Sequence, residues 1–240
     1  MPSKSTKARK STTQTVRERV EKSGARFWTY SDFKGMPPLA VAKALSRLAR
    51  DGVLRRVSKG VYYRSAPTSF GPSAPSASSV SAKTLHAPLH PAGLSAANVL
   101  GLTTQNPRRP EYATPAPAPP SALRDAVVHT GRSPRRAGLS AKDGAILEIL
   151  RERANSSDLS PEETANRLMR LLADDERFQR LVEVAMTEPP RVRAMLGALG
   201  QELNMPARLL ERLRKSLNPL TRFDFGRLAS LRHADEWQAK

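Results

Sequence analysis

Basic side chains recur at helical spacing between residues 38 and 51. Lys43, Arg47 and Arg50 lie four and three positions apart, which places them with Ser46 on one face of a helix. An α-helix fits the major groove of B-DNA, where an arginine can donate two hydrogen bonds to guanine O6 and N7, and a serine can contact any base. The spacing therefore indicates a helix whose outer face could read base edges.

A second basic group follows at once, in the segment VLRRVSKGVYYR at residues 53–64. Two short β-branched and aromatic runs flank a Ser-Lys-Gly sequence, and Gly60 suits the left-handed backbone of a hairpin turn. A hairpin beside a DNA-reading helix places cations near the flanking phosphates, which position a protein without reading sequence. The candidate phosphate contacts are Arg55, Arg56, Lys59 and Arg64.

The elements that would position these side chains can be read from the first 66 residues. Helical periodicity begins near Thr13 and stops at Ser23-Gly24, and the aromatic segment 26–33 suits a short strand or a buried turn. Ser31 is a candidate N-cap for a brief second helix and joins the candidate DNA-contacting set. A third helix is expected from Pro38 to Asp51, with an apolar face of Val41, Ala44, Leu45 and Leu48. Three short helices followed by a hairpin predict a winged helix-turn-helix over residues 13–66.

The charge of the chain is concentrated at its start. The 240 residues carry a formal net charge of +18, of which residues 1–65 account for +12, with 16 basic and 4 acidic side chains. Residues 138–240 carry 17 basic and 16 acidic side chains and are nearly neutral. Such an excess indicates a polyanionic partner, most often nucleic acid. Residues 1–12 are basic and lack an apolar stretch, so we expect a disordered arm there rather than a secretory signal.

Little in the sequence suggests catalysis, a metal or a cofactor. There are no cysteines, and no phosphate-binding loop or hydrolase motif occurs. We expect His86, His90, His129 and His233 to be structural or solvent-exposed, and Asp174, Asp175 and Glu176 to form a helix cap or a solvated turn. We therefore expect no catalytic, metal or cofactor site. No apolar run is long enough to span a membrane, and we expect a cytoplasmic protein.

The rest of the chain predicts a second domain. Residues 67–83 are rich in Ser, Ala and Pro and indicate a linker. Residues 84–137 predict a small sheet with a short helix at 95–102, a turn or polyproline stretch at 115–120 and a strand near 126–129. Helices follow over residues 139–226, one of them opening on the capping box that begins at Ser160. The fold class is therefore α+β, a winged helix-turn-helix before a mainly helical C-terminal domain, residues 84–240, with a small sheet.

Several of these segments resemble the AbiEi-type antitoxins of abortive-infection toxin–antitoxin operons. The N-terminal stretch YSDF…ALSRLARDGVLRRVSKGVYY is similar to the winged helix of that family. The segment GLSAANVLGLTTQNPRRPEY, residues 93–112, resembles a motif of its second domain. Residues 188–203 and 216–226 are also similar, so the resemblance covers most of the chain between residues 15 and 226. The segment between the hairpin and residue 95 departs from the family pattern, which implies a reduced central sheet.

The resemblance implies an antitoxin that represses its own promoter and takes part in phage defence. The winged helix would bind inverted repeats, as a monomer or weak dimer that loads cooperatively on DNA. The C-terminal domain would antagonise a nucleotidyltransferase-like toxin without a stable complex. The DNA-contacting face of the family carries over to Ser46, Arg47, Arg55, Arg56 and Lys59.

Three other functions stay open at this point. The chain could be a plain winged-helix transcriptional regulator without a toxin. It could also neutralise a toxin by direct protein–protein contact through its nearly neutral C-terminal half. An enzyme that modifies the toxin is a further possibility, which the lack of a recognisable nucleophile or metal cluster disfavours.

Overall fold

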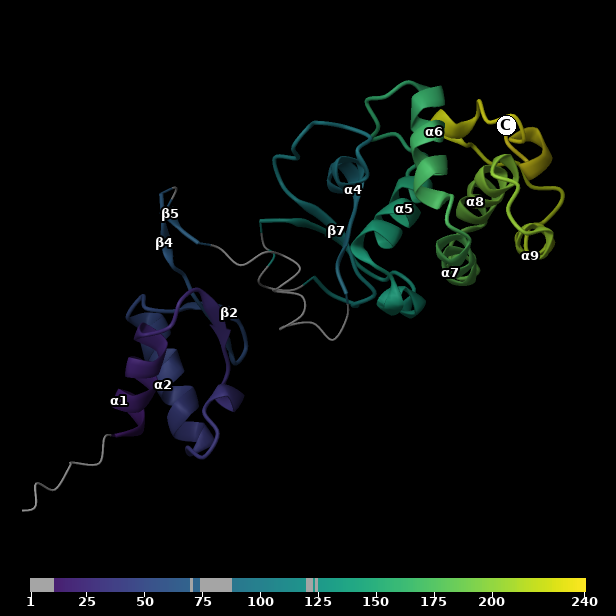
Figure 1. Ribbon diagram of the computed structural model, residues 1–240. Coiled ribbons are helices and arrows are strands. Elements are labelled where there is room, and N and C mark those ends of the chain that lie inside the picture. Colours follow the sequence, from purple (N-terminus) through teal and green to yellow (C-terminus); the bar gives the residue numbers. More distant parts are fainter. Residues whose placement is uncertain (1–10, 70, 74–87, 120–122, 124) are drawn as a thin grey trace, which may run out of the picture. The chain divides into compact units, whose positions relative to one another are not determined.

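The computed structural model describes residues 11–69, 71–73, 88–119, 123 and 125–240. These residues fall into two compact units, one that contains residues 11–73 and one that contains residues 88–119 and 125–240 (Figure 1). Each unit has a hydrophobic core of its own. None of the described helices is long and apolar enough to cross a membrane.

The N-terminal unit has the element order of a winged helix. It contains α1 (Thr12–Glu21), β1 (Arg26–Trp28), the short 3₁₀ helix η1 (Tyr30–Asp32), α2 (Pro38–Arg50), β2 (Arg55–Ser58) and β3 (Val61–Arg64). The strands form an antiparallel sheet in the order β1-β3-β2, and α1 packs against α2 (Figure 1). The predicted winged helix-turn-helix arrangement is therefore present.

The helix α2 forms where the periodicity predicts it. Pro38 occupies the first turn, where its missing N–H costs nothing because that donor has no intrahelical acceptor. The predicted apolar face is buried: Val41, Ala44, Leu45 and Leu48 pack with Val16 and Val20 of α1 and with Trp28 of β1. The helix ends at Asp51, and Gly52 follows at a φ of +76°. The tight turn after α2 returns the chain to β2.

The hairpin of β2 and β3 also matches its prediction. Ser58 pairs with Val61, and Gly60 in the turn between them has a φ of +76°, which favours glycine. Tyr62 pairs with Trp28, and both side chains belong to the core beneath the helices. The opposite face carries a smaller cluster of Phe27, Val57, Val61 and Tyr63.

Three local predictions are wrong. Ser31 is not an N-cap, because it lies within η1, whose cap is Thr29. The predicted arm is too long, since Ser11 caps α1 and Thr12 is its first residue. The predicted linker contains a small hairpin of β4 (Pro67–Thr68) and β5 (Gly71–Pro72), closed where the Ala66 N–H donates to Ser73 Oγ at 2.8 Å. Residues 1–10, 74–83 and His86 lie outside the described residues.

The C-terminal unit begins with the predicted small sheet. Its strands are β6 (His90–Pro91), β7 (Glu111–Ala113) and β8 (Val127–His129), in the order β6-β7-β8. β6 and β7 are antiparallel, whereas β7 and β8 are parallel. The short helix α4 (Gly93–Leu100) starts two residues before its predicted position and ends at Gly101, which has a φ of +69°. Residues 115–118 form a bend, which is one of the two predicted conformations.

Helices make up most of the C-terminal unit. After the 3₁₀ helix η3 (Pro134–Gly138) come α5 (Ala141–Arg151), α6 (Pro161–Leu172), α7 (Asp175–Ala185), α8 (Pro190–Glu202) and α9 (Ala207–Lys215). The predicted capping box is formed, since Ser160 Oγ accepts from the Glu163 N–H at 3.1 Å and Glu163 accepts from the Ser160 N–H. Asp174 caps α7, as one alternative for the acidic trio predicts.

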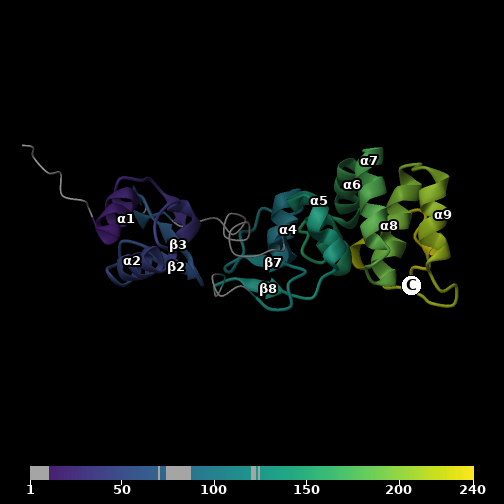
Figure 2. The same ribbon diagram turned by 90° about the horizontal axis from the view of Figure 1, so that it is seen from below.

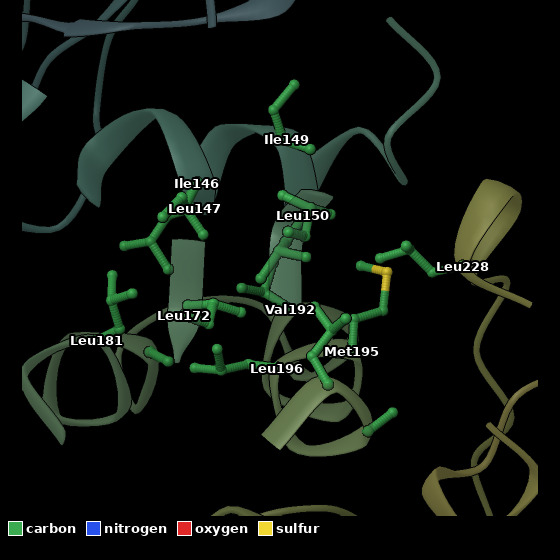
Figure 3. Packing of buried hydrophobic residues seen from close by; sticks show 14 of the residues in the cluster. Ile146, Leu147, Ile149, Leu150, Leu172, Leu181, Val192, Met195, Leu196 and Leu228 are labelled. Carbon is green, nitrogen blue, oxygen red and sulfur yellow. The ribbon is translucent and has the colours of Figure 1, made fainter. Parts of the chain in front are cut away.

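The core of the C-terminal unit surrounds α8, which packs against α5, α6, α7 and α9 (Figure 2). Apolar side chains of α5, α6, α7 and α8, among them Ile146, Leu172 and Leu196, meet between the ribbons (Figure 3). The chain end closes this core through η4 (Gly226–Leu228) and η5 (Asp235–Trp237), with Phe225 and Trp237 fully buried. Gly197 of α8 is necessary there, because a Cβ at this position would overlap the Trp237 ring.

Candidate nucleic-acid interface

The outer face of α2 presents the predicted basic side chains to solvent. Lys43, Ser46, Arg47 and Arg50 are all exposed, opposite the buried stripe of the same helix. Among the described residues, none of these three cations forms an ion pair, so their donors can contact a ligand. The amphipathic pattern of α2 thus fixes which side faces the core and which side faces outward.

Three acidic side chains of the same unit are paired with arginines outside α2. Glu21 and Asp51 both contact Arg17, whose Nη2 lies 2.6 Å from Asp51 Oδ2 and whose Nε lies 3.5 Å from Glu21 Oε1. Asp32 accepts from Arg26 at 3.0 Å. Arg17 and Arg26 lie outside the predicted DNA-contacting set. These three carboxylates therefore do not offset the cations of α2, which favours attraction of a polyanion.

Ser46 couples α2 to the sheet. Its Oγ lies 2.8 Å from the Tyr62 hydroxyl of β3, and either group can donate. A hydroxyl also has two acceptor lone pairs, so Ser46 can keep this bond and still contact a base. The bond fixes the outer face of α2 relative to the hairpin that follows it.

The hairpin divides its two adjacent arginines between its faces. Arg56 pairs with Tyr62 on the side of the sheet that faces the helices, whereas Arg55 pairs with Tyr63 on the other side. Both side chains are exposed, and Arg56 Nε donates to Ser58 O at 3.5 Å. Lys59 is exposed in the turn itself. Arg56 and Lys59 are thus the hairpin cations best placed to act with α2.

Two predicted contact residues have other roles. The Arg64 guanidinium donates from Nη1 to the Val20 carbonyl at 2.6 Å and also contacts the carbonyls of Glu21 and Ser23. It therefore caps the C-terminus of α1, where unpaired carbonyls favour a cation. Ser31 Oγ lies 2.7 Å from Thr29 Oγ1 within the turn of η1. The sequence could not show these contacts, because the partners of Arg64 lie more than 40 residues away along the chain.

Sequence reasoning missed two exposed apolar side chains of the same unit. Leu39, in the first turn of α2, is 78% exposed, and Tyr30 in η1 is 59% exposed. Leu39 lies four residues before Lys43 and seven before Ser46, so it continues the exposed stripe of α2 toward the helix N-terminus. The sequence could have shown that Leu39 is exposed, because Leu39 lies outside the apolar stripe at residues 41, 44, 45 and 48.

The C-terminal unit contains a buried ionic network that sequence reasoning also missed. Arg136 is fully buried, with Nη1 2.5 Å from Glu148 Oε1 and Nε 2.7 Å from Glu188 Oε1. Arg132 and Arg151 hold the outer oxygens of these two carboxylates. Burial alone would raise the pKa of Glu148, but Arg132 and Arg136 outweigh it and lower that pKa. Both carboxylates are paired with arginines on each oxygen, so we interpret the network as one that stabilises the fold.

The described histidines also have structural surroundings. His90 is buried against Gly144 of α5, and its Nε2 lies 3.2 Å from the Arg136 carbonyl. Burial, and then the charge of Arg136, lower the pKa of His90. His129 lies 3.6 Å from Glu111, and His233 lies 2.7 Å from Glu236. No group of three or more metal-ligating side chains occurs among the described residues.

Part of the chain matches the model of a protein family. Residues 20–119 match the model of a family of unknown function, DUF6088, over somewhat less than half of the chain. The match runs from the end of α1 to the bend after β7, so it includes both α2 and the motif at residues 93–112. None of the curated proteins compared matches the chain.

One solved structure is similar over almost the whole chain. The RV2827C protein from Mycobacterium tuberculosis is 21% identical, with a TM-score of 0.52, over 94% of this chain and 89% of that protein. At this identity the similarity concerns the fold alone.

Proposed function

We propose that this protein binds double-stranded DNA through the outer face of α2 and the β2–β3 hairpin. The observation that carries the proposal is the unpaired, exposed row of Lys43, Arg47 and Arg50 on a helix backed by its own core. A helix of this kind enters the major groove, where Arg47 and Arg50 can donate to guanine. Lys59 and Arg56 contact the flanking phosphates and fix the register of the protein on the duplex.

We further propose that the DNA is the promoter of the protein's own operon, and that the chain is an antitoxin. The resemblance to AbiEi-type antitoxins supports this role, and it extends from the winged helix into α4, α8 and the segment 216–226. The match to one family model across residues 20–119 supports a functional link between the winged helix and α4. In this proposal, the C-terminal unit antagonises a nucleotidyltransferase-like toxin in the cytoplasm, without a stable complex.

Repression of a reporter gene tests the DNA-binding part. A reporter placed behind the DNA upstream of this gene should be repressed by the full chain and released by Arg47→Ala. Purified protein should shift that DNA in preference to random duplex at about 150 mM salt, where non-specific phosphate binding is weakened. Equal binding of both duplexes would exclude sequence-specific repression.

The antitoxin part needs a separate experiment, because Arg47→Ala removes repression without touching the C-terminal unit. Full-length Arg47→Ala protein should still rescue cells arrested by the toxin encoded next door. Rescue without co-purification of the toxin supports indirect antagonism, whereas stable co-purification favours the alternative of direct neutralisation. A neighbouring gene unrelated to any toxin would favour a plain transcriptional regulator.

A further inference from the structure

The exposed face of α2 has an apolar side chain at its N-terminal end, and this side chain bears on which bases the protein reads. Leu39, Lys43, Ser46 and Arg50 follow one another at intervals of four, three and four residues, and all four are exposed. Three of them are polar or charged, as a solvent-facing stripe requires. Leu39 is the exception, and it stands at the end of the helix nearest Pro37-Pro38.

The position of Leu39 distinguishes it from a surface leucine without a role. Single exposed apolar side chains are common, and Leu220 in the C-terminal unit is one, at 90% exposed. Leu39, however, lies in the first turn of the helix whose outer face carries Lys43 and Arg47. In helix-turn-helix proteins the N-terminal residues of the recognition helix meet base edges. Leu39 therefore belongs to the surface that enters the groove.

We propose that Leu39 is a specificity-determining residue that contacts the 5-methyl group of a thymine in the major groove. This inference rests on the proposed DNA binding. The thymine methyl is the one apolar group that base edges display in the major groove, so it is the feature that an aliphatic side chain can recognise. Lys43, Ser46 and Arg47, one to two turns further along, contact the polar base edges next to that thymine. The operator thus combines a thymine with neighbouring guanine.

Replacement of thymine by deoxyuridine tests the contact, because the substitution removes the methyl group and keeps the base pair. Preferred duplexes are first selected from a random pool with the full chain, and each thymine is then replaced in turn. Removal of one buried methyl group should weaken binding by wild-type protein about fourfold at one position of each half-site. Leu39→Ala protein should bind the thymine and deoxyuridine duplexes equally.

Two controls separate this inference from the proposed function. Leu220→Ala removes a leucine of the other unit that is even more exposed, and it should leave the sensitivity to deoxyuridine unchanged. Arg47→Ala should weaken selection at a guanine and keep the sensitivity to deoxyuridine. Leu39 buries little surface, so a fold unchanged by circular dichroism is expected for Leu39→Ala.

The outcomes are distinct. If no preferred duplex emerges from the pool, sequence-specific DNA binding fails, and the thymine contact fails with it. If a preferred duplex emerges but no thymine can be distinguished from deoxyuridine, or if Leu39→Ala stays as sensitive as wild type, only the thymine contact is overturned. A change in self-association of Leu39→Ala, with sensitivity to deoxyuridine unchanged, would assign Leu39 to a protein interface and would also overturn it.

Discussion

At the scale of single residues, Arg47 and Lys59 are expected to act on different parts of the DNA. Arg47→Ala removes a side chain of α2 that donates to guanine. We expect a loss of about 1–3 kcal/mol in binding free energy and a weaker preference for the selected sequence. Lys59→Ala removes a hairpin cation and should weaken binding to all sequences alike, with a salt slope shallower by about one. Fluorescence anisotropy with selected and random duplexes, over a range of salt concentrations, measures both. Identical effects of the two substitutions would contradict the separate roles.

Arg136 is expected to contribute to stability rather than to binding. Arg136→Met removes the cation between Glu148 and Glu188, which stay buried. Loss of one partner of a buried pair costs about 3–5 kcal/mol, and the remaining contacts with Arg132 and Arg151 favour the lower end. Urea unfolding measures the change, with the exposed Arg170→Met as the control. Equal stability of the two variants would show that the network adds nothing to folding.

His90 predicts a pH dependence of stability. Burial and Arg136 lower its pKa below the unfolded value of 6.5, so the unfolded chain binds a proton that the folded chain does not. This contribution to stability is complete above pH 6.5 and is lost as the pH falls below it. His90→Gln retains a donor for the Arg136 carbonyl but cannot titrate. Thermal unfolding at about pH 7.5 and 5.5 should show a larger fall in Tm for wild type than for the variant. An equal fall in both would assign the effect to other groups.

At the scale of elements, the capping box of α6 is a direct test of local folding. Ser160→Ala removes the acceptor of the Glu163 N–H, and we expect a loss of about 1 kcal/mol in unfolding free energy. Ser230→Ala, in an exposed turn, should change stability by less than about 0.5 kcal/mol. Chemical denaturation compares them. If Ser160→Ala changes the unfolding free energy no more than Ser230→Ala does, Pro161 and the packing of Leu168 determine where α6 begins.

Elements with a strong period were predictable from the sequence. The helices α2 and α6 each bury a stripe that repeats at helical spacing, and a proline or a capping box marks the start of each. The hairpin with Gly60 was predictable for a different reason, because its turn requires a residue with a left-handed backbone. The β4–β5 hairpin was not, since Pro, Ser and Ala give no alternation and its closure depends on Ser73.

The candidate interface was predictable only in part. Helical spacing placed Lys43, Arg47 and Arg50 on one face, and local sequence sufficed for that. The role of Arg64 depends on the distant α1 terminus, and the separation of Arg55 from Arg56 depends on strand pairing. Tertiary contacts of this kind cannot be read from periodicity. Leu39 could have been found, because it breaks the polar pattern of the outer face.

At the scale of the whole molecule, the two units divide the charge. The first 65 residues carry a net +12, whereas residues 84–240, with 23 basic and 18 acidic side chains, carry only +5. Each unit also has a core of its own, so substitutions in one unit are expected to leave the other folded. A chain built this way can bind a polyanion with its first unit while the second unit serves another purpose.

Binding of the upstream DNA by two charge-matched variants tests the central claim most directly. One variant replaces Lys43, Arg47 and Arg50 of α2 by alanine, and the other replaces the exposed Lys142, Arg170 and Arg212 of the C-terminal unit. Both variants lose three positive charges, so the net charge of the protein changes equally. At about 150 mM salt, the α2 variant should lose at least a hundredfold in affinity, because several base contacts of roughly 1–3 kcal/mol disappear, while the control keeps most of its binding. Equal losses in both variants would contradict a DNA-reading face on α2.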